Sequence, residues 1–329
     1  MTARGSRAAG GAGDHRAAVG SAMKVRIIDL DEEKLRFTLD GVDVAFANAL
    51  RRTMISELPC MAIDDLFIFD NSSVVNDEVL AHRIGLVPIK TDLDNYVLPE
   101  DCECQSELGC EKCRVVLTLD VEAETDTLTV TSGDFVSVDP DVVPNSPDIP
   151  LTKIAPGQAV RLEAYAKLGI GKDHAKWQPV SEAIYQHIAE IDVDEERCTA
   201  CDECVKACPR DVFEIEKGKL KIVDVNACTL CGECVKACPV EPSAVTQGAM
   251  VDTYLFTVES TGCLPPEKIV SEAGRVLLAK LGEFSEKVEK GETHAVIKDF
   301  ESYQLQTRGL YSLGTGDIAK EDKEEDVKP

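Results

Sequence analysis

Apolar and polar residues alternate along several stretches of the chain, which predicts a structure rich in β-strands. The segment KVRIIDLDEEKLRFTLDG, residues 24–41, contains two alternating runs around the acidic turn Asp31–Glu33, a pattern typical of a β-hairpin. RVVLTLDVEAETDTLTV, residues 114–130, predicts a strand, a turn and a second strand, and VDTYLFTVES, residues 251–260, predicts one more. The stretch 139–158 contains five prolines and is predicted to be a loop or linker.

Two other segments repeat apolar residues at helical spacing. VDVAFANALRRTMISELP, residues 42–59, predicts a helix that Pro59 stops, and LPPEKIVSEAGRVLLAKLGEFSEKVEK, residues 264–290, predicts a longer helix with Pro265 and Pro266 in its first turn. The stripe of the second helix is close to a heptad, so we expect it to pack against another helix, in this chain or in a partner. The two stripes comprise Phe46, Ala49, Leu50, Thr53, Met54 and Glu57 in the first helix, and Ile269, Val270, Ala273, Leu277, Leu281, Phe284 and Val288 in the second.

Residues 60–90 predict a strand, a turn at Asn71–Ser73 and a short helix over about Asp77–Ile84 that is capped by Gly85. His82 lies on this helix. We interpret it as a packing or surface residue, because no second His or Cys lies near it at ligand spacing.

RLEAYAKLGIGKDHAKWQPV, residues 161–180, predicts a strand, a glycine turn and an extended segment. Its GIGKDH sequence suggests a phosphate-binding loop only superficially, because the full spacing G-x-x-x-x-G-K-[ST] is missing. We therefore interpret Gly169 and Gly171 as residues of a strand end, and His174 and Trp177 as packing or partner contacts.

The composition narrows the class of protein. The net charge of −25 arises from 35 Lys and Arg against 60 Asp and Glu, which argues against general binding of nucleic acid. No apolar run approaches the ~20 residues of a membrane span, and no secretory signal is visible, so a cytoplasmic location is predicted. Residues 1–22 are predicted to be a disordered extension, with Met23 as an alternative start, and residues 300–329 a disordered acidic tail.

Most of the fourteen cysteines lie at metal-type spacings, which fits a reducing compartment. CTACDECVKACP, residues 198–209, and CTLCGECVKACP, residues 228–239, share the spacing C-x₂-C-x₂-C-x₃-C-P of bacterial ferredoxins, which hold [4Fe–4S] clusters. Between them, DVFEIEKGKLKIVD at 211–224 predicts a hairpin, as in a two-cluster ferredoxin. We predict one cluster-binding module over residues 191–247.

In a two-cluster module the fourth Cys of each motif ligates the other cluster. This crossing ties the two halves together, so losing one Cys should loosen both, and cluster binding should fold the module. The predicted ligands are Cys198, Cys201, Cys204 and Cys238 for one cluster, and Cys228, Cys231, Cys234 and Cys208 for the second.

Four more cysteines lie in CECQSELGCEKC, residues 102–113, at the spacing C-x-C-x₅-C-x₂-C. Four thiolates in one loop can form a tetrahedral zinc site. Free thiols or a disulfide in an exposed loop are the alternative, and the spacing favours zinc. The predicted ligands are Cys102, Cys104, Cys110 and Cys113.

The flanking sequence resembles the D-type subunit family of archaeal DNA-directed RNA polymerase, which is related to the third-largest subunit of eukaryotic polymerase II and, more distantly, to the N-terminal domain of the bacterial α subunit. The resemblance covers most of residues 24–290. It is carried by AFANALRRTMISELPCMAIDDLFIFDNSSVVNDEVLAHRIGLVPI, by the G-x-G-x-x-H-A-K-W strand, by TYLFTVESTGCLPPEKIVSEAGRVLL, and by the thiolate loop, which resembles the zinc loop of the eukaryotic relative.

The resemblance implies an α+β fold. It implies an α-subunit-like dimerisation domain formed by residues 24–59 and 249–290, an inserted mostly-β domain at 60–190, and a ferredoxin-like domain at 191–247. It further implies a non-catalytic assembly subunit of DNA-directed RNA polymerase, which pairs with subunit L and nucleates assembly of the large subunits. No catalytic residue, no direct specific DNA contact and no membrane contact are implied for this chain.

Arg51 and Arg52 lie at the edge of the stripe of the first helix. The pattern alone favours a solvated basic face over a contact with a partner. The resemblance reverses this preference, because it implies that the matching positions contact a large subunit.

The cluster motifs alone allow a second function, that of a ferredoxin-domain electron carrier or oxidoreductase subunit. Electron transfer usually requires a further redox site, yet the chain shows neither a Rossmann glycine pattern after a strand nor a third cluster motif. A structural or redox-sensing role of the clusters therefore competes with electron transfer, and the resemblance favours it.

Overall fold

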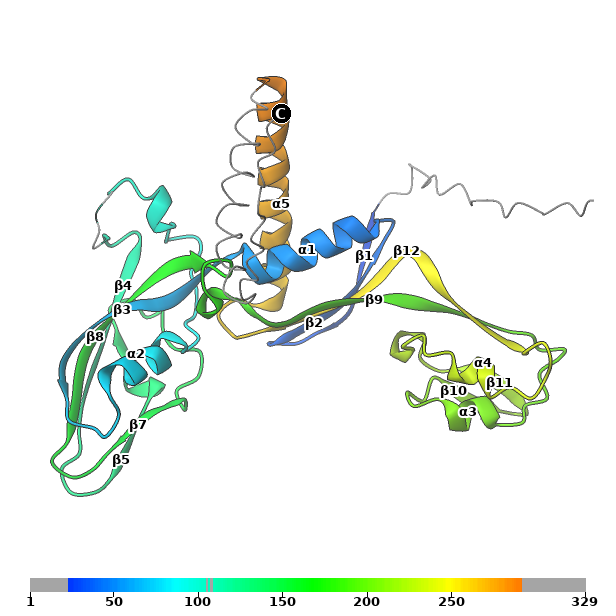
Figure 1. Ribbon diagram of the computed structural model, residues 1–329, viewed down its shortest axis with the longest axis horizontal. Coiled ribbons are helices and arrows are strands. Elements are labelled where there is room, and N and C mark those ends of the chain that lie inside the picture. The colour runs from blue at the N-terminus through cyan, green and yellow to red at the C-terminus, as the bar shows by residue number, and fades with distance from the viewer. Residues whose placement is uncertain (1–22, 105, 107–108, 292–329) are drawn as a thin grey trace, which may run out of the picture. The chain divides into compact units, whose positions relative to one another are not determined.

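The computed structural model describes residues 23–104, 106 and 109–291 (Figure 1). The predicted N-terminal extension at 1–22 and acidic tail at 300–329 lie outside these residues. Within the described part of the chain, strands form antiparallel sheets and the helices lie between or after them, which confirms the predicted α+β class.

The first sheet has the strand order β1-β2-β12-β9. Its hairpin, β1 with β2, is confirmed: the Asp31 carboxylate accepts hydrogen bonds from the backbone N–H groups of Glu33 and Lys34 at 3.0 and 2.7 Å and so shapes the turn. Phe37 of β2 stacks on Phe256 of β12, with ring centroids 5.0 Å apart. The strands are β1 (Lys24–Leu30), β2 (Lys34–Asp40), β12 (Val245–Ser260) and β9 (Val180–Val193).

β9 and β12 pair in two stretches. Tyr254–Ser260 of β12 pairs with the first half of β9, and Val245–Ala249 pairs with its end at Ala189–Val193, next to the cysteine motifs (Figure 1). β12 thus begins earlier than the strand predicted at 251–260. The predicted domain boundary at residue 190 falls inside β9, which pairs with β12 on both sides of this point.

The first predicted helix is α1 (Val44–Ser56). The side chain of Asp43 caps it by accepting a hydrogen bond from the Phe46 backbone N–H at 2.7 Å. The predicted stripe is only partly correct, because Phe46 remains 38% exposed, whereas the unpredicted Ala47 is fully buried. The helix is rotated relative to the predicted stripe, since the face that packs near β9 is set by the sheet. Its buried residues are Ala47, Leu50, Thr53 and Met54.

The second predicted helix is α5 (Pro266–Glu289), with Pro266 as its first residue, as the sequence indicates. Its buried residues are confined to the first turns: Pro266, Ile269 and Ala273. The chain divides into two units between Val276 and Leu277, within this helix. In the second unit, the apolar side chains Leu278, Leu281, Phe284 and Val288 are exposed.

A second sheet has the order β3-β8-β4-β6, and a separate pair is formed by β5 and β7. Their inward side chains form one core with Leu80 and Ile84 of α2 (Asp77–Gly85), close to the predicted short helix. The strands predicted within 114–130 are present as β4 and β5, but they lie in different sheets. The strands are β3 (Pro59–Asn71), β8 (Ala159–Ile170), β4 (Arg114–Glu122), β6 (Val136–Ser137), β5 (Leu128–Thr131) and β7 (Pro150–Ile154).

The prediction that 139–158 is entirely loop is wrong at β7. Pro150 stands at the first residue of the strand, where a missing N–H group is tolerated. Leu151, Thr152 and Ile154 are buried, so contact with the core outweighs the local proline signal.

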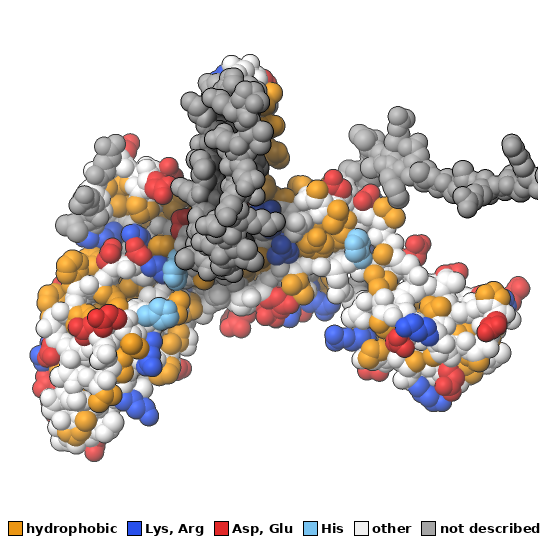
Figure 2. All heavy atoms as spheres, in the orientation of Figure 1, with side chains coloured by type: hydrophobic (Ala, Val, Ile, Leu, Met, Phe, Trp, Pro, Cys, Tyr) orange, Lys and Arg blue, Asp and Glu red, His pale blue; other side chains and the backbone are white. Residues whose placement is uncertain are grey.

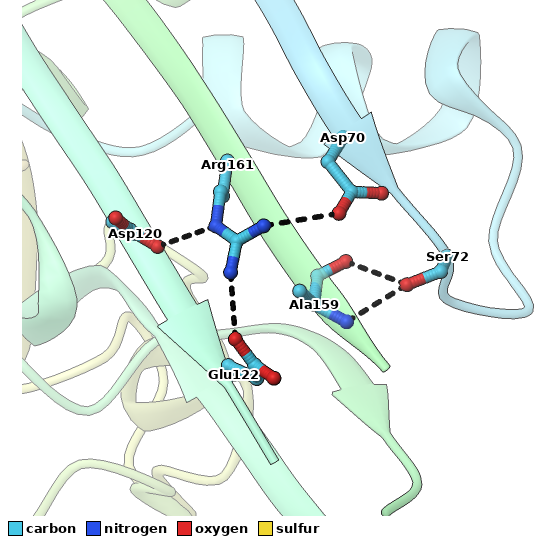
Figure 3. A network of polar contacts seen from close by, with 6 residues as sticks. All are labelled: Asp70, Ser72, Asp120, Glu122, Ala159 and Arg161. Carbon is cyan, nitrogen blue, oxygen red and sulfur yellow. Dashed lines mark hydrogen bonds and ion pairs between the residues drawn. The ribbon is translucent and has the colours of Figure 1, made fainter. Parts of the chain in front are cut away.

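Figure 3 shows a polar network across the outer face of the second sheet. Arg161 of β8 contacts Asp120 at 3.0 Å and Glu122 at 2.6 Å on β4, and Asp70 of β3 at 3.5 Å. Beside it, Ser72 donates to the carbonyl of Ala159 at 3.1 Å and accepts from its N–H at 2.8 Å. One guanidinium group thus joins three neighbouring strands. The ion pairs are exposed to solvent, so each contributes little to the stability of the fold.

Trp177 packs against the end of β8, as the sequence predicts. The indole is buried and donates from Nε1 to the Lys167 carbonyl at 3.2 Å. A Cβ atom at Gly169 would lie 2.4 Å from the indole, and one at Gly171 would lie 2.3 Å from the Ile55 carbonyl at the end of α1. Both glycines are therefore needed for close approach, not for a phosphate loop.

Between the ends of β9 and β12, the chain forms a small module around the hairpin predicted between the cysteine motifs. Each motif contributes one short helix. Val212, Phe213 and Val245 form the module's core together with buried cysteines. The elements of the module are α3 (Glu203–Ala207), β10 (Phe213–Glu216), β11 (Lys219–Ile222) and α4 (Glu233–Lys236).

Short 3₁₀ turns also occur among the described residues, at Pro99–Asp101, Ser132–Asp134, Ala175–Trp177 and Val225–Ala227.

The surface shows no extended basic area among the described residues on the face in Figure 2, where Lys and Arg lie scattered among Asp and Glu. Among the described helices, none is both long and apolar enough to cross a membrane.

Candidate metal centres

The cysteines of the two ferredoxin-like motifs gather around two separate cavities in the module. The first cavity is lined by Cys198, Cys201 and Cys204 of the first motif and by Cys238, the last Cys of the second motif. The second cavity is lined by Cys228, Cys231 and Cys234 and by Cys208 of the first motif. The structure therefore brings the eight residues together in the same two crossed sets that the sequence predicts.

The backbone around the cavities repeats as the sequence does. Ala200 and Asp202 of the first motif have positive φ angles of 52° and 70°, and Leu230 and Gly232 of the second have 57° and 76°. Left-handed conformations at non-glycine residues cost of order 1 kcal/mol or more each and are typical of functional sites. In each motif these residues lie between the first three cysteines, which line one cavity.

Several sulfur atoms accept hydrogen bonds. The Cys228 sulfur accepts from the Gln247 side-chain amide at 3.1 Å and from the Leu230 backbone N–H at 3.5 Å, and the Cys238 sulfur accepts from the Ala244 backbone N–H at 3.4 Å. Burial raises the pKa of Cys238, but hydrogen bonds from the Ser243 hydroxyl and nearby backbone N–H groups outweigh it, so the pKa is lowered overall. Burial raises the pKa of the Cys204 thiol.

These donor sets fit a [4Fe–4S] cluster. Each cavity presents four sulfur ligands, the soft donors that iron–sulfur clusters require. The other lining residues of the first cavity include Leu220, Val240 and Val245, so the site is shielded by apolar side chains. When bound, a cluster would supply one-electron redox chemistry and four covalent links to the module, three to one motif and one to the other.

The cysteines of the loop after Pro99–Asp101 converge on a single point. All four sulfur atoms lie within 4.8 Å of one another. Three of the pairs are 3.6, 3.8 and 3.8 Å apart. Sulfurs arranged tetrahedrally about 2.3 Å from one zinc ion would lie about 3.8 Å apart. The loop therefore has the geometry of a site for a single metal ion, with four sulfur ligands from Cys102, Cys104, Cys110 and Cys113.

The thiols of this loop differ in acidity. A hydrogen bond from the Lys112 backbone N–H is the main cause that lowers the pKa of Cys110 to about 7. A backbone hydrogen bond from Cys104 lowers the pKa of Cys102, but hydrogen bonding with the Cys104 thiol and burial raise it to about 12. One thiolate is therefore available near neutral pH to start metal binding.

Two cysteines outside these three sets are buried together, which no sequence pattern predicts. Hydrogen bonding with the Cys263 side chain is the main cause that raises the pKa of the Cys60 thiol. Thr91 links them further, because its hydroxyl lies 3.5 Å from the Cys60 sulfur and its N–H donates to the Cys263 carbonyl at 2.9 Å. No local spacing could reveal this pair, since Cys60 lies at the start of β3 and Cys263 precedes α5.

The remaining predicted site residues, Arg51 and Arg52, lie on α1, and two histidines that the sequence analysis interprets as packing, surface or partner-contact residues lie at one surface pocket. Arg51 on α1 donates to the Asn48 side chain at 3.2 and 3.0 Å, and Arg52 is exposed. His82 and His174 line one surface pocket with Lys176, although the sequence indicates no relation between them. His174 accepts a hydrogen bond at Nδ1 from the Lys176 backbone N–H at 3.0 Å, so it has a local structural role.

Comparison with known proteins agrees with this architecture. Residues 65–194 match the family model of the RNA polymerase Rpb3/RpoA insert domain, and residues 197–242 match that of the 4Fe-4S dicluster domain. Together with the fold, these matches define an RNA polymerase subunit of the Rpb3/RpoA class that carries a dicluster domain. The match also supports iron–sulfur binding by the module.

Proteins that match most of this chain identify the family within this class. The DNA-directed RNA polymerase subunit Rpo3 of Archaeoglobus fulgidus is 42% identical over 267 residues, 81% of this chain and 98% of that protein. Rpo3 of Methanosphaera stadtmanae is 37% identical over 78% of this chain and 96% of that protein, and Rpo3 of Pyrococcus furiosus is 34% identical over 82% and 98%. The chain therefore belongs to the Rpo3 family of DNA-directed RNA polymerase subunits, which confirms the resemblance found in the sequence.

Proposed function

We propose that this chain is a non-catalytic assembly subunit of DNA-directed RNA polymerase, which pairs with a small subunit of the L type and then nucleates assembly of the large subunits. Membership of the Rpo3 family supports a place in a polymerase complex. The observation that carries the pairing step is the exposed apolar face of α5.

This face consists of Leu281, Phe284 and Val288, which are 62%, 58% and 52% exposed. They recur at helical spacing on a helix that is otherwise rich in charge. Full burial of such a side chain contributes about 1.5–3 kcal/mol, so a partner that covers the face gains substantial stability. The partner we propose is an apolar helical surface of subunit L.

We propose domain bounds that keep paired strands of one sheet in the same domain where the sequence allows it. The dimerisation domain comprises residues 24–59 and 249–290, and we add residues 180–190 of β9 to it because β9 pairs with β12. The inserted domain then covers residues from 60 up to β9 and includes the thiolate loop. The ferredoxin-like domain comprises residues 191–247.

We propose two [4Fe–4S] clusters with a structural or regulatory role, held by the two crossed cysteine sets, and one zinc ion held by Cys102, Cys104, Cys110 and Cys113. The two cavities and the sulfur–sulfur distances support these assignments. Arg51 and Arg52 are proposed to contact a large subunit, because a planar guanidinium group suits bidentate pairing with a partner carboxylate.

An electron carrier is the alternative, and it rests on the cluster motifs alone. It would require turnover at the clusters with a physiological electron donor. Matches that extend along most of the chain to polymerase subunits disfavour it.

Co-purification tests the pairing. Wild-type protein isolated anaerobically from its host should carry a small L-like subunit and the large polymerase subunits. Leu281→Glu should reduce recovery of the small subunit at least tenfold, because it places a charge in the apolar interface. Val74→Glu is the control, since Val74 is also exposed but belongs to the proposed inserted domain. Equal recovery with both variants would refute the proposed interface.

A further inference from the structure

Gln247 connects the second cysteine set to strand β12. Its side-chain Nε2 donates to the Cys228 sulfur at 3.1 Å, and its backbone lies in the part of β12 that pairs with Ile191 of β9. Among the described cysteines of the two motifs, Cys228 is the one whose sulfur accepts from a side-chain amide. Gln247 also lines the second cavity.

The repeat differs at the residue that lies beside the Gln247 amide. Gly232 stands at the left-handed position of the second motif, and a Cβ atom there would lie 3.9 Å from the Gln247 Oε1 atom. The first motif has Asp202 at the equivalent position, where its carboxylate lies 3.7 Å from Lys206. The second motif thus places no carboxylate beside the Gln247 amide, whereas the first motif has one at the equivalent position. The two halves are therefore chemically inequivalent despite their matched spacing.

A donor to a ligand sulfur changes the redox behaviour of a cluster. Reduction adds one negative charge, and an N–H group directed at a thiolate stabilises the more negative state more strongly. Hydrogen bonds to the sulfurs are among the factors that set cluster reduction potentials. Removing the Gln247 donor should therefore make reduction of the adjacent cluster harder.

We propose that Gln247 is a positioning residue that raises the reduction potential of the cluster held by Cys228, Cys231, Cys234 and Cys208, and so makes the two clusters of the module inequivalent. This inference rests on the proposed two-cluster module. It assigns to a side chain of β12, a strand of the first sheet, a direct hydrogen bond to a ligand of this cluster.

Gln186 provides a matched control on the other strand. It lies on β9 and its Nε2 donates to the Asn226 carbonyl at 3.0 Å, near Cys228 but not to a sulfur. Both glutamines are half-buried and both link a strand of the first sheet to the second half of the module. Gln186→Leu thus removes a similar link without changing the hydrogen bonding of a ligand.

The test is an anaerobic redox titration of the full-length protein with dithionite, followed by electron paramagnetic resonance, for the wild type, Gln247→Leu and Gln186→Leu. In Gln247→Leu, one midpoint potential should shift to more negative values while the other stays in place, at unchanged iron content. Gln186→Leu should leave both potentials unchanged. Equal potentials in all three iron-loaded proteins, or equal shifts in both variants, would overturn the role of Gln247. Wild-type protein without iron would instead overturn the proposed cluster sites themselves.

Discussion

Asp64 lies at a bulge in β3, where the pairing with β8 shifts between Ile63 and Asp65. The bulge directs its carboxylate to the ammonium groups of Lys167 and Lys176. Lys176 also donates to the Ile63 carbonyl at 3.2 Å, and its ammonium group lies 4.4 Å from the centre of the Trp177 ring. This cluster therefore connects β3 to the segment that follows β8.

Replacing Asp64 by Asn should destabilise the inserted domain by about 1 kcal/mol at neutral pH, because Lys176 is largely buried and would lose its carboxylate. Burial raises the pKa of Asp64, but hydrogen bonds from Lys167 and Lys176 outweigh it and lower the pKa below the usual value. A lowered pKa contributes stability above the unfolded-state pKa of about 4, and this is lost as the pH falls through the folded-state pKa.

Urea unfolding followed by fluorescence of Trp177, the one tryptophan of the chain, measures this effect at the site itself. The difference between wild type and Asp64→Asn should be present at pH 7 and should shrink as the pH falls below the unfolded-state pKa of about 4. A difference that persists unchanged in acid would contradict the electrostatic origin.

Replacing Gly169 by Ala should destabilise the same region by about 1–3 kcal/mol, because the new methyl group would overlap the Trp177 indole. The same fluorescence measurement applies. Gly274→Ala on α5 is the control, since nothing lies within 4 Å of its Cβ position, and it should be neutral or slightly stabilising. Similar losses in both variants would contradict the packing role of Gly169.

At the scale of elements, local sequence patterns predict that a helix or strand exists better than they predict which of its faces is buried. The spacing of apolar residues predicts the helix at 44–56, but it places Phe46 in the buried stripe and omits Ala47. Leu50, Thr53 and Met54 are predicted correctly, so the buried face is shifted only slightly around the helix axis. A short pattern cannot reveal this shift, because the sheet that receives the helix is built from strands far away in the sequence. The same holds for β7, whose strand partner β5 decides its conformation.

The thiolate loop takes all four of its proposed metal ligands from one short segment, residues 102–113. Cys113→Ser should reduce bound zinc to well below one ion per chain, because the loop would retain three of its four sulfur ligands. Zinc and iron are measured together by mass spectrometry of the purified protein. Cys263→Ser, a change outside the loop, should keep zinc at the wild-type level. Wild-type protein without zinc would refute the site.

At the scale of the whole molecule, the module is entered by β9 and left by β12, so it is an appended unit on a paired two-strand connection. Its halves are linked by the crossed sets, in which Cys208 and Cys238 each face the other half's cysteines. The helices α1 and α5 of the proposed dimerisation domain lie outside it. Damage to the module should therefore leave the first pairing step intact.

Cys208→Ser or Cys238→Ser should lower iron bound by both cluster sites and reduce recovery of complete polymerase, while the pair with the small subunit still forms. Pull-downs through this chain, with iron analysis of each eluate, measure both effects. Cys60→Ser, a cysteine outside the module, is the control for iron content. Wild-type yields of complete polymerase from iron-depleted variants would exclude a role of the module in assembly.

The sequence by itself determined the features that depend on short spacing: the run of three cysteines that begins each motif, the thiolate loop and the hairpin at 24–41. The family followed from the longer resemblance, and the crossing of Cys208 and Cys238 from the ligation pattern of two-cluster modules. Ligands within a few residues of one another are constrained by the chain itself, so their spacing carries the chemistry. The tertiary structure alone decided which strands share a sheet, how α1 is rotated, and that Gln247 contacts Cys228. These depend on contacts between distant segments, where burial against a common core outweighs local preference.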